Sequence, residues 1–137
     1  MLSRLTTPSL LFVVCALLSG CGDKLARVEG TVTFNGEPVS RGMINLEPTD
    51  GKGSVYGASV ENGKFLIEDV LPGEKIVRIS AAYTKEIKKE ADGSEIEICD
   101  DLLPAEYGQN SKERLNVEAP STKKDYAFTG TDPRKKK

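Results

Sequence analysis

The chain has 137 residues, of which 38% are hydrophobic, and a formal net charge of −2 at pH 7. This size and composition are typical of one globular domain. It contains no histidine and no tryptophan, which excludes catalytic triads that depend on His and zinc sites ligated by His. The mildly acidic balance gives no electrostatic reason to expect nucleic-acid binding.

An apolar run at residues 10–18 follows the basic residue Arg4. Nine residues are too few to span a bilayer, which takes about 20, and this arrangement is typical of an export signal. The run closes with Leu18, Ser19, Gly20 and Cys21, which resemble the bacterial lipobox. The resemblance implies cleavage before Cys21 and diacylation of its thiol, and two or more acyl chains anchor a protein stably. The alternatives are an ordinary secretory signal with a chance cysteine, or an unprocessed anchor.

We therefore divide the chain into a lipoprotein signal peptide (1–20), a lipidated tether (21–25), a folded domain (26–129) and a basic tail (130–137). Removal of residues 1–20 leaves 117 of the 137 residues and removes one basic residue, Arg4, so the net charge changes from −2 to −3. Cys15 leaves with the signal and Cys21 carries lipid, so Cys99 has no partner for an intrachain disulfide. We expect Cys99 to be buried as a small hydrophobe; a reactive or intermolecular thiol is the alternative.

From residue 26 onward, apolar and polar residues alternate, which is typical of half-buried β-strands. The first predicted strand, residues 26–34, is followed by Asn35-Gly36, a strong hairpin signal. Further strands are predicted at residues 43–47, 55–60, 65–67 and 75–82. The residues predicted to face the core are Val28, Gly30, Val32, Phe34, Ile44, Leu46, Phe65, Ile67, Val77, Ile79 and Ala81. Short strands separated by turns every 8–12 residues or so favour a sandwich or barrel.

The segment 84–99 is more charged, and we predict a protruding hairpin or long loop with Ile96 and Ile98 facing inward. A short helix at residues 84–91 is the alternative. An apolar turn at residues 102–108 is expected to pack onto the sandwich. Two last strands are predicted at 114–119 and 124–129, with Leu115, Val117, Tyr126 and Phe128 inward. The tail 130–137 is predicted to be disordered and solvated; contact with anionic lipid or cell-wall polymer is the alternative.

The order of turns along residues 28–82 resembles the carboxypeptidase regulatory-like (transthyretin-like) domain. The first strand and turn are Val28-Glu29-Gly30-Thr31-Val32 and Asn35-Gly36-Glu37-Pro38-Val39-Ser40-Arg41-Gly42. The next turns are Asn62-Gly63-Lys64-Phe65 and Val70-Leu71-Pro72-Gly73-Glu74, after which Lys75-Ile76 replaces the usual aromatic residue. Segments 103–108, 115–118 and 126–128 resemble small lipoproteins of this type that are abundant in planctomycete-like bacteria.

The resemblance covers about residues 28–128 and implies an all-β fold. The expected architecture is a seven- to eight-stranded antiparallel β-sandwich of transthyretin-like or immunoglobulin-like type. It implies no active site, because in metallocarboxypeptidases this domain lies beside the catalytic one. The matched glycines and prolines are interpreted as turn positions, with positive φ expected at Gly63 and Gly73 and Pro72 fixing its own φ.

Carboxylates are the main catalytic candidates in the sequence. Asp100 and Asp101 are adjacent, and Asp92, Glu95 and Glu97 are near them, but neighbours in a strand point to opposite faces and do not form an acid–base pair. The loop 48–53 offers one carboxylate, Asp50, which is too few for a calcium site. Tyr56, Tyr83, Tyr107 and Tyr126 are expected to pack in the core or at its rim rather than to stack on a ligand. We predict no catalytic residue, no cofactor and no metal site.

We therefore expect a non-catalytic lipoprotein of the cell envelope that acts as a structural or protein-interaction module. The lipid on Cys21 would anchor it in a membrane, facing the periplasm or the exterior, and Gly22 after the cysteine favours the outer membrane. Its partner would be an envelope protein or polymer and not nucleic acid. Binding of a carbohydrate or another small ligand is the alternative function, and an enzyme or enzyme subunit is the third.

Overall fold

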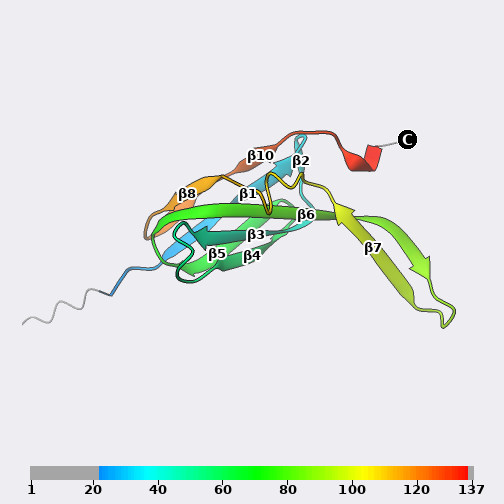
Figure 1. Cartoon of the computed structure of the whole chain (residues 1–137), viewed down its shortest axis with the longest axis horizontal. Helices are drawn as coiled ribbons and strands as arrows, with labels where there is room; N and C mark the ends of the chain where they lie inside the picture. Colours follow the sequence, from blue (N-terminus) through cyan, green and yellow to red (C-terminus); the bar gives the residue numbers. More distant parts are fainter. Residues whose placement is uncertain (1–21, 136–137) are drawn as a thin grey trace, which may run out of the picture.

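The computed structural model describes residues 22–135 of the chain and is all-β (Figure 1). Within those residues there is no α-helix, and no helix is long and apolar enough to cross a bilayer. The predicted fold class is confirmed. The elements are β1 (Ala26–Phe34), β2 (Glu37–Pro38), β3 (Arg41–Pro48), β4 (Tyr56–Glu61), β5 (Lys64–Val70), β6 (Gly73–Lys89), β7 (Glu95–Asp101), β8 (Arg114–Val117), β9 (Ser121–Lys123), β10 (Tyr126–Phe128) and the 3₁₀ turn η1 (Pro133–Lys135).

The predicted signal peptide and the lipobox residues lie outside the described residues. The lipobox positions are Leu18, Ser19, Gly20 and Cys21, and they stay a prediction. The described chain starts at Gly22, and the short tether leaves one end of the β-sandwich (Figure 1).

The strands follow the order β10-β1-β5-β4-β3-β6-β7, with β2 and β9 also on β1 and β8 on β6. The described chain has ten strands rather than seven or eight, because β2 and β9 are separate elements of two and three residues. Most pairs are antiparallel, as predicted, but β9 and β10 pair with β1 in parallel. Both lie along the same edge of β1 and run in the same direction as it.

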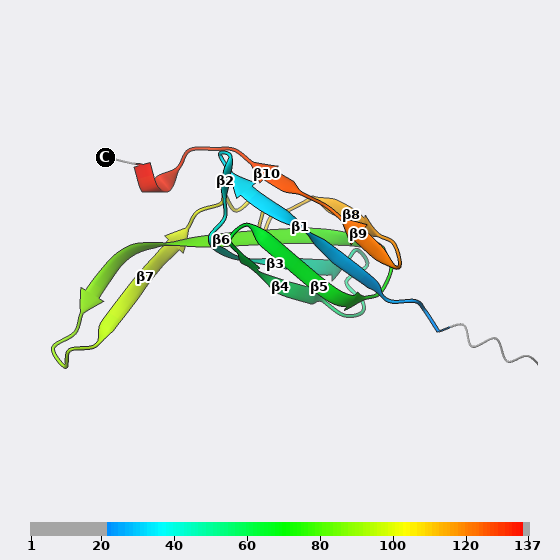
Figure 2. The same ribbon diagram turned by 180° about the vertical axis from the view of Figure 1, so that it is seen from behind.

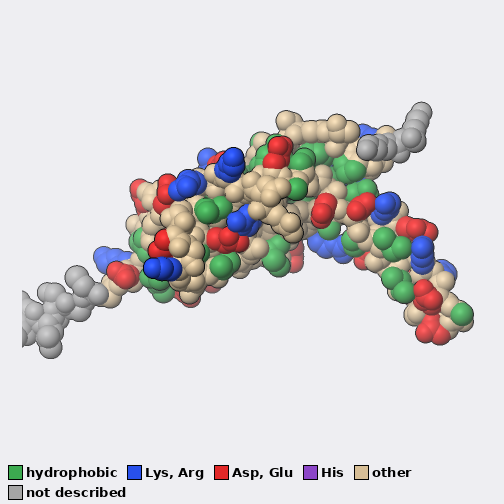
Figure 3. Space-filling model, viewed as in Figure 1, with side chains coloured by type: hydrophobic (Ala, Val, Ile, Leu, Met, Phe, Trp, Pro, Cys, Tyr) green, Lys and Arg blue, Asp and Glu red, His purple; other side chains and the backbone are tan. Residues whose placement is uncertain are grey.

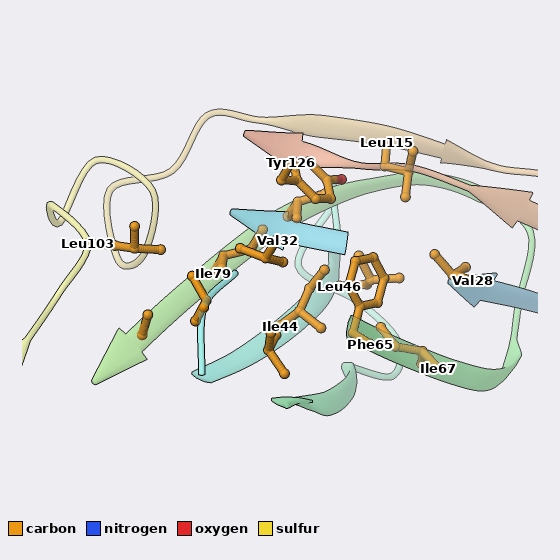
Figure 4. Close-up of a cluster of buried hydrophobic side chains, with 14 of the residues drawn as sticks. Val28, Val32, Ile44, Leu46, Phe65, Ile67, Ile79, Leu103, Leu115 and Tyr126 are labelled. Atoms are coloured by element: carbon orange, nitrogen blue, oxygen red, sulfur yellow. The ribbon is translucent and has the colours of Figure 1, made fainter. Parts of the chain in front are cut away.

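The sheet folds over on itself to form a sandwich. Strands β4 and β5 share only the pair Glu61↔Lys64, so the sheet is almost interrupted between them. The part that contains β1 and β5 therefore packs face to face with the part that contains β3 and β6. Side chains from β1 and β5 point toward those of β3 and β6 (Figure 4). The buried set includes Val28, Val32, Phe34, Ile44, Leu46, Phe65, Ile67, Val77, Ile79, Ala81, Leu115, Val117 and Tyr126, which confirms the predicted core. Phe128 is only half-buried against it.

The turns use residues that tolerate a left-handed backbone. Gly63 and Gly73 have φ of 75° and 127°, as predicted, and Asn35-Gly36 connects β1 to β2 with φ of 51° and 82°. Gly30 is buried and faces the core within the first strand, as predicted. It lies inside β1, where an added Cβ would stand 1.7 Å from the backbone oxygen of Lys124. A glycine inside a strand often marks such a close backbone approach.

The long strand β6 continues past the core and forms a hairpin with β7, with Ala82↔Asp101 and Lys89↔Glu95 as its end pairs. The hairpin prediction is confirmed and the helix is excluded. The inward orientation of Ile96 is wrong, because the hairpin projects beyond the core (Figures 1 and 2) and leaves this side chain 48% exposed. Cys99 is also exposed rather than buried, for the same reason.

Residues 130–135 of the predicted basic tail pack against the domain. Asn35 and Gly130 exchange two hydrogen bonds of 3.0 Å. Asp132 is 8% exposed, and its carboxylate accepts hydrogen bonds from the Arg134 guanidinium at 2.7 and 2.9 Å. Arg134 also pairs with Glu37 at 3.1 Å. Asp132 therefore pairs with a basic residue of the same tail. The net positive charge of the tail gives no indication of this ion pair.

Candidate functional site

A loop of residues 102–113, between β7 and β8, covers one edge of β6. The backbone N–H of Ile79 donates to the carbonyl of Tyr107 at 2.8 Å, and that of Val77 donates to Glu113 at 2.9 Å. Leu102 and Leu103, the first residues of the loop, are buried, which confirms that this turn packs onto the sandwich. The loop thereby satisfies backbone groups that an open sheet edge would expose.

The loop, β6 and β10 together line an open pocket of about 270 Å³. Val77 and Ile79 of β6 and Phe128 of β10 supply apolar surface, and Tyr107 of the loop supplies a second ring. The remaining lining residues are polar: Glu106, Ser111 and Glu113. Pockets for drug-sized ligands measure roughly 300–1,000 Å³, so this one suits a small molecule or a single chemical group.

Aromatic rings run from this pocket into the core. The ring centroids of Tyr107 and Phe128 are 4.2 Å apart, those of Phe128 and Tyr126 are 6.1 Å apart, and those of Tyr126 and Phe65 are 6.3 Å apart. We call these four residues the aromatic row. Ring faces carry negative electrostatic potential, and the Nζ of Lys124 already lies over the Tyr126 ring, 5.9 Å from its centroid.

Two carboxylates add negative charge beside the rings. Burial, with a further contribution from Glu106, raises the pKa of Tyr107. Burial is also the larger cause, and Glu113 the smaller, of the raised pKa of Tyr126. Among residues 22–135, neither glutamate forms an ion pair. The pocket therefore concentrates negative charge next to apolar and aromatic surface.

The pocket residues are held in place by contacts of the loop with β6 and within the loop itself. The Arg78 guanidinium donates to the carbonyls of Gly108, at 3.2 Å, and Gln109, and it pairs with Glu47 at 2.7 Å. The hydroxyl of Ser111 accepts a hydrogen bond from the Glu113 N–H at 3.2 Å. These contacts fix the backbone that carries Glu106, Tyr107 and Glu113, as expected of a preformed site.

The structure disperses the carboxylates that the sequence suggested as catalytic candidates. Asp100 pairs with Lys85 at 3.0 Å, Glu95 with Lys89 at 3.3 Å and Glu97 with Arg41 at 3.1 Å. Asp50 and Asp92 accept hydrogen bonds from backbone N–H groups within their own turns. Over residues 22–135 no group of three or more Asp, Glu or Cys converges as a metal site.

The tyrosines pack as predicted, and one of them also lines the pocket. Tyr126 is buried, and Tyr56, Tyr83 and Tyr107 are half-buried against the core. Sequence reasoning missed the pocket because Tyr107 and Phe128 lie far apart in the chain and meet only when the 102–113 loop closes over β6. The adjacent Glu106-Tyr107 pair was visible, but nothing in the sequence placed a second ring beside it.

The projecting part of the hairpin, residues 83–101, forms a second candidate surface, which we call the hairpin arm. It contains three lysines and seven carboxylates, a net charge of −4, and charged and hydrophobic side chains mix along it (Figure 3). Ile87 is 59% exposed and Ile96 is 48% exposed. Ile87 pairs with Glu97 and Ile96 with Lys88, so the two isoleucines lie on opposite faces.

The end of the sandwich opposite the hairpin arm carries the tether. Leu25, Val55 and Leu71 are exposed apolar residues from the tether, the β3–β4 loop and the β5–β6 turn. Both ribbon views place these segments at the end where the tether leaves (Figures 1 and 2). The tether and the hairpin arm thus lie at opposite ends of the molecule.

Fold and surface together define a single all-β domain with a projecting hairpin and a small acidic, aromatic pocket. No protein-family model matches the chain, and no curated protein matches it. A crystal structure of a 9R-lipoxygenase from Cyanothece PCC8801 is similar over 77% of this chain and 16% of that chain, with 12% sequence identity and a TM-score of 0.33. A likeness at that level carries no conclusion about activity.

Proposed function

We propose that this protein is a non-catalytic cell-envelope lipoprotein of carboxypeptidase regulatory-like type, and that it presents the hairpin arm to an envelope partner. The lipid on Cys21 would hold the tether end at a membrane, facing the periplasm or the exterior. The observation that carries the proposal is the placement of the hairpin arm at the end opposite the tether (Figure 1).

Two surface properties support this orientation. Leu25, Val55 and Leu71 expose apolar area at the tether end, where it would lie nearest the lipid. The hairpin arm exposes Ile87 and Ile96 amid a net charge of −4. Each face of the arm thus offers one exposed isoleucine to a partner, and the negative charge favours a partner with a basic surface.

A second candidate function is the binding of a small ligand in the pocket beside Tyr107 and Phe128. The specific observation in its favour is that aromatic, apolar and carboxylate groups converge on one preformed hollow. Neither function requires the other, so they are tested separately.

Anchoring is tested by expressing the full-length chain and Cys21→Ala in a bacterial host, followed by membrane fractionation and intact mass measurement. We expect the wild type in the membrane fraction with the mass of added acyl chains, and the variant without that mass and out of the membrane. If both are soluble and cleaved at another bond, the lipoprotein proposal fails.

The role of the hairpin arm is tested by site-specific photo-crosslinking in intact cells. A photoreactive amino acid at Ile96 should give discrete crosslinked products that weaken at high salt, because exposed charges are screened. The matched control is the same residue at Ser59, which is exposed on β4. Identical products from both positions, or none from Ile96, would contradict an interaction through the arm.

A further inference from the structure

We infer that the pocket between the 102–113 loop, β6 and β10 binds a small organic cation through an alkylammonium group. This inference rests on the second candidate function, ligand binding, and not on lipid anchoring. It is carried by the rings of Tyr107 and Phe128, the carboxylates of Glu106 and Glu113, and the size of the hollow.

The rings favour a cation over a neutral or anionic ligand. An ammonium group within about 6 Å of a ring centroid is attracted to the ring face, most strongly where water is excluded. This sandwich already uses the interaction twice, since Lys124 Nζ lies 5.9 Å from the Tyr126 ring and Lys75 Nζ lies 5.7 Å from the Tyr56 ring. In the described chain, no lysine or arginine occupies the corresponding position over Tyr107 or Phe128.

The charge of the pocket points the same way. Glu106 and Glu113 line its exposed rim, and within residues 22–135 neither has a cationic partner. A phosphate or carboxylate ligand would be repelled by two such groups, whereas an ammonium group would compensate them. A neutral sugar would gain nothing from this charge.

The apolar lining and the volume limit the rest of the ligand. Val77 and Ile79 form the almost fully buried floor of the hollow, so a short methylene chain would pack mainly on the half-buried rings of Tyr107 and Phe128 while the charged end faces the carboxylates. A pocket of about 270 Å³ accommodates a short alkyl amine rather than a large ring system. The same group occurs on free amines and on lysine side chains.

The test is an NMR titration of the full-length protein in non-ionic detergent, following the backbone amides of residues 102–113. The probes are butylammonium chloride, 1-butanol, sodium butyrate, glucose and the capped amino acid Nα-acetyl-lysine methylamide. We expect saturable shifts with butylammonium and with the lysine derivative, and none of comparable affinity with the other three. Tighter binding of the lysine derivative would assign the cation to a protein side chain, and tighter binding of butylammonium to a free amine; both support the inference.

Variants separate charge from ring contributions. Glu106→Gln combined with Glu113→Gln should weaken butylammonium binding about tenfold or more, whereas Glu61→Gln, on β4, should not change it. Tyr107→Leu should weaken binding, and Tyr107→Phe should retain it and show that the loop still folds. Equal binding of 1-butanol, stronger binding of glucose, or an unchanged affinity in the double variant would overturn the inference. The same titration on Cys21→Ala keeps its failure distinct from failure of the anchoring proposal.

Discussion

At the scale of single residues, Gly30 has the least room of the glycines within residues 22–135. It is buried in the middle of β1, and the backbone of Lys124 passes over it between β9 and β10. We expect Gly30→Ala to lower the free energy of unfolding by about 2–3 kcal/mol, because a side chain there must displace backbone rather than a flexible side chain. Urea denaturation followed by circular dichroism measures the change.

Gly22→Ala is the matched control for this substitution. An added Cβ at Gly22 meets nothing within 4 Å, so its free energy of unfolding should stay within about 0.5 kcal/mol of wild type. If Gly30→Ala were as stable as Gly22→Ala, the close approach of the Lys124 carbonyl would not exist in solution.

The tail offers a second residue-scale prediction, based on Asp132. The hydrogen bonds from Arg134 lower the pKa of Asp132 from 3.8 to about 2, although desolvation of the carboxylate opposes this. Because the folded-state pKa is the lower one, ionised Asp132 stabilises the fold above about pH 4. That contribution disappears as the pH falls from about 4 to about 2.

Asp132→Asn should therefore be less stable than wild type at pH 6, and the difference should shrink as the pH falls from about 4 to about 2. The measurement is the urea midpoint of both proteins at a series of pH values. Asp23→Asn, in the exposed tether, is the control and should follow wild type throughout. A wild-type-to-variant difference that is independent of pH would show that Asp132 does not act through its charge.

At the scale of elements, the alternation of apolar and polar residues correctly predicted most of the strands. Val28, Val32 and Phe34 face the core as the period of two requires, and the Asn-Gly pairs at 35–36 and 62–63 make the expected turns. These features are local, so sequence alone determines them. The parallel pairing of β9 and β10 with β1 could not be predicted in this way, because it depends on where the chain returns after β8.

The hairpin shows where local reasoning about elements fails. Its alternation correctly predicts strands, but alternation says nothing about whether a core lies against either face. Ile96 and Cys99 were therefore expected inside and are exposed. The pocket was missed for a related reason, since Tyr107 and Phe128 meet through tertiary folding alone.

At the scale of the whole molecule, the structure separates into a packed sandwich and the hairpin arm. The sandwich closes its own β6 edge with the 102–113 loop, and so it does not need the arm for that purpose. In the arm, residues 87–97 are all exposed. Their ion pairs, Lys89 with Glu95 and Glu97 with Arg41, lie at the surface. Such pairs contribute about 0–1 kcal/mol each.

We therefore predict that the arm can be shortened without unfolding the sandwich. Replacing residues 87–97 by Asn-Gly would join Glu86 to Ile98, which already pair across the hairpin, through a turn suited to that connection. The free energy of unfolding should change by less than about 1 kcal/mol, whereas Leu103→Ala, in the loop over β6, should lower it by about 2–4 kcal/mol. Urea denaturation of the three proteins measures both effects.

A loss above about 3 kcal/mol in the shortened chain would make the arm a structural part of the core. Retained stability, together with crosslinks from a photoreactive amino acid at Ile98 in the full arm but not in the shortened chain, would assign the arm to partner binding, because the scaffold that positions it would be unchanged.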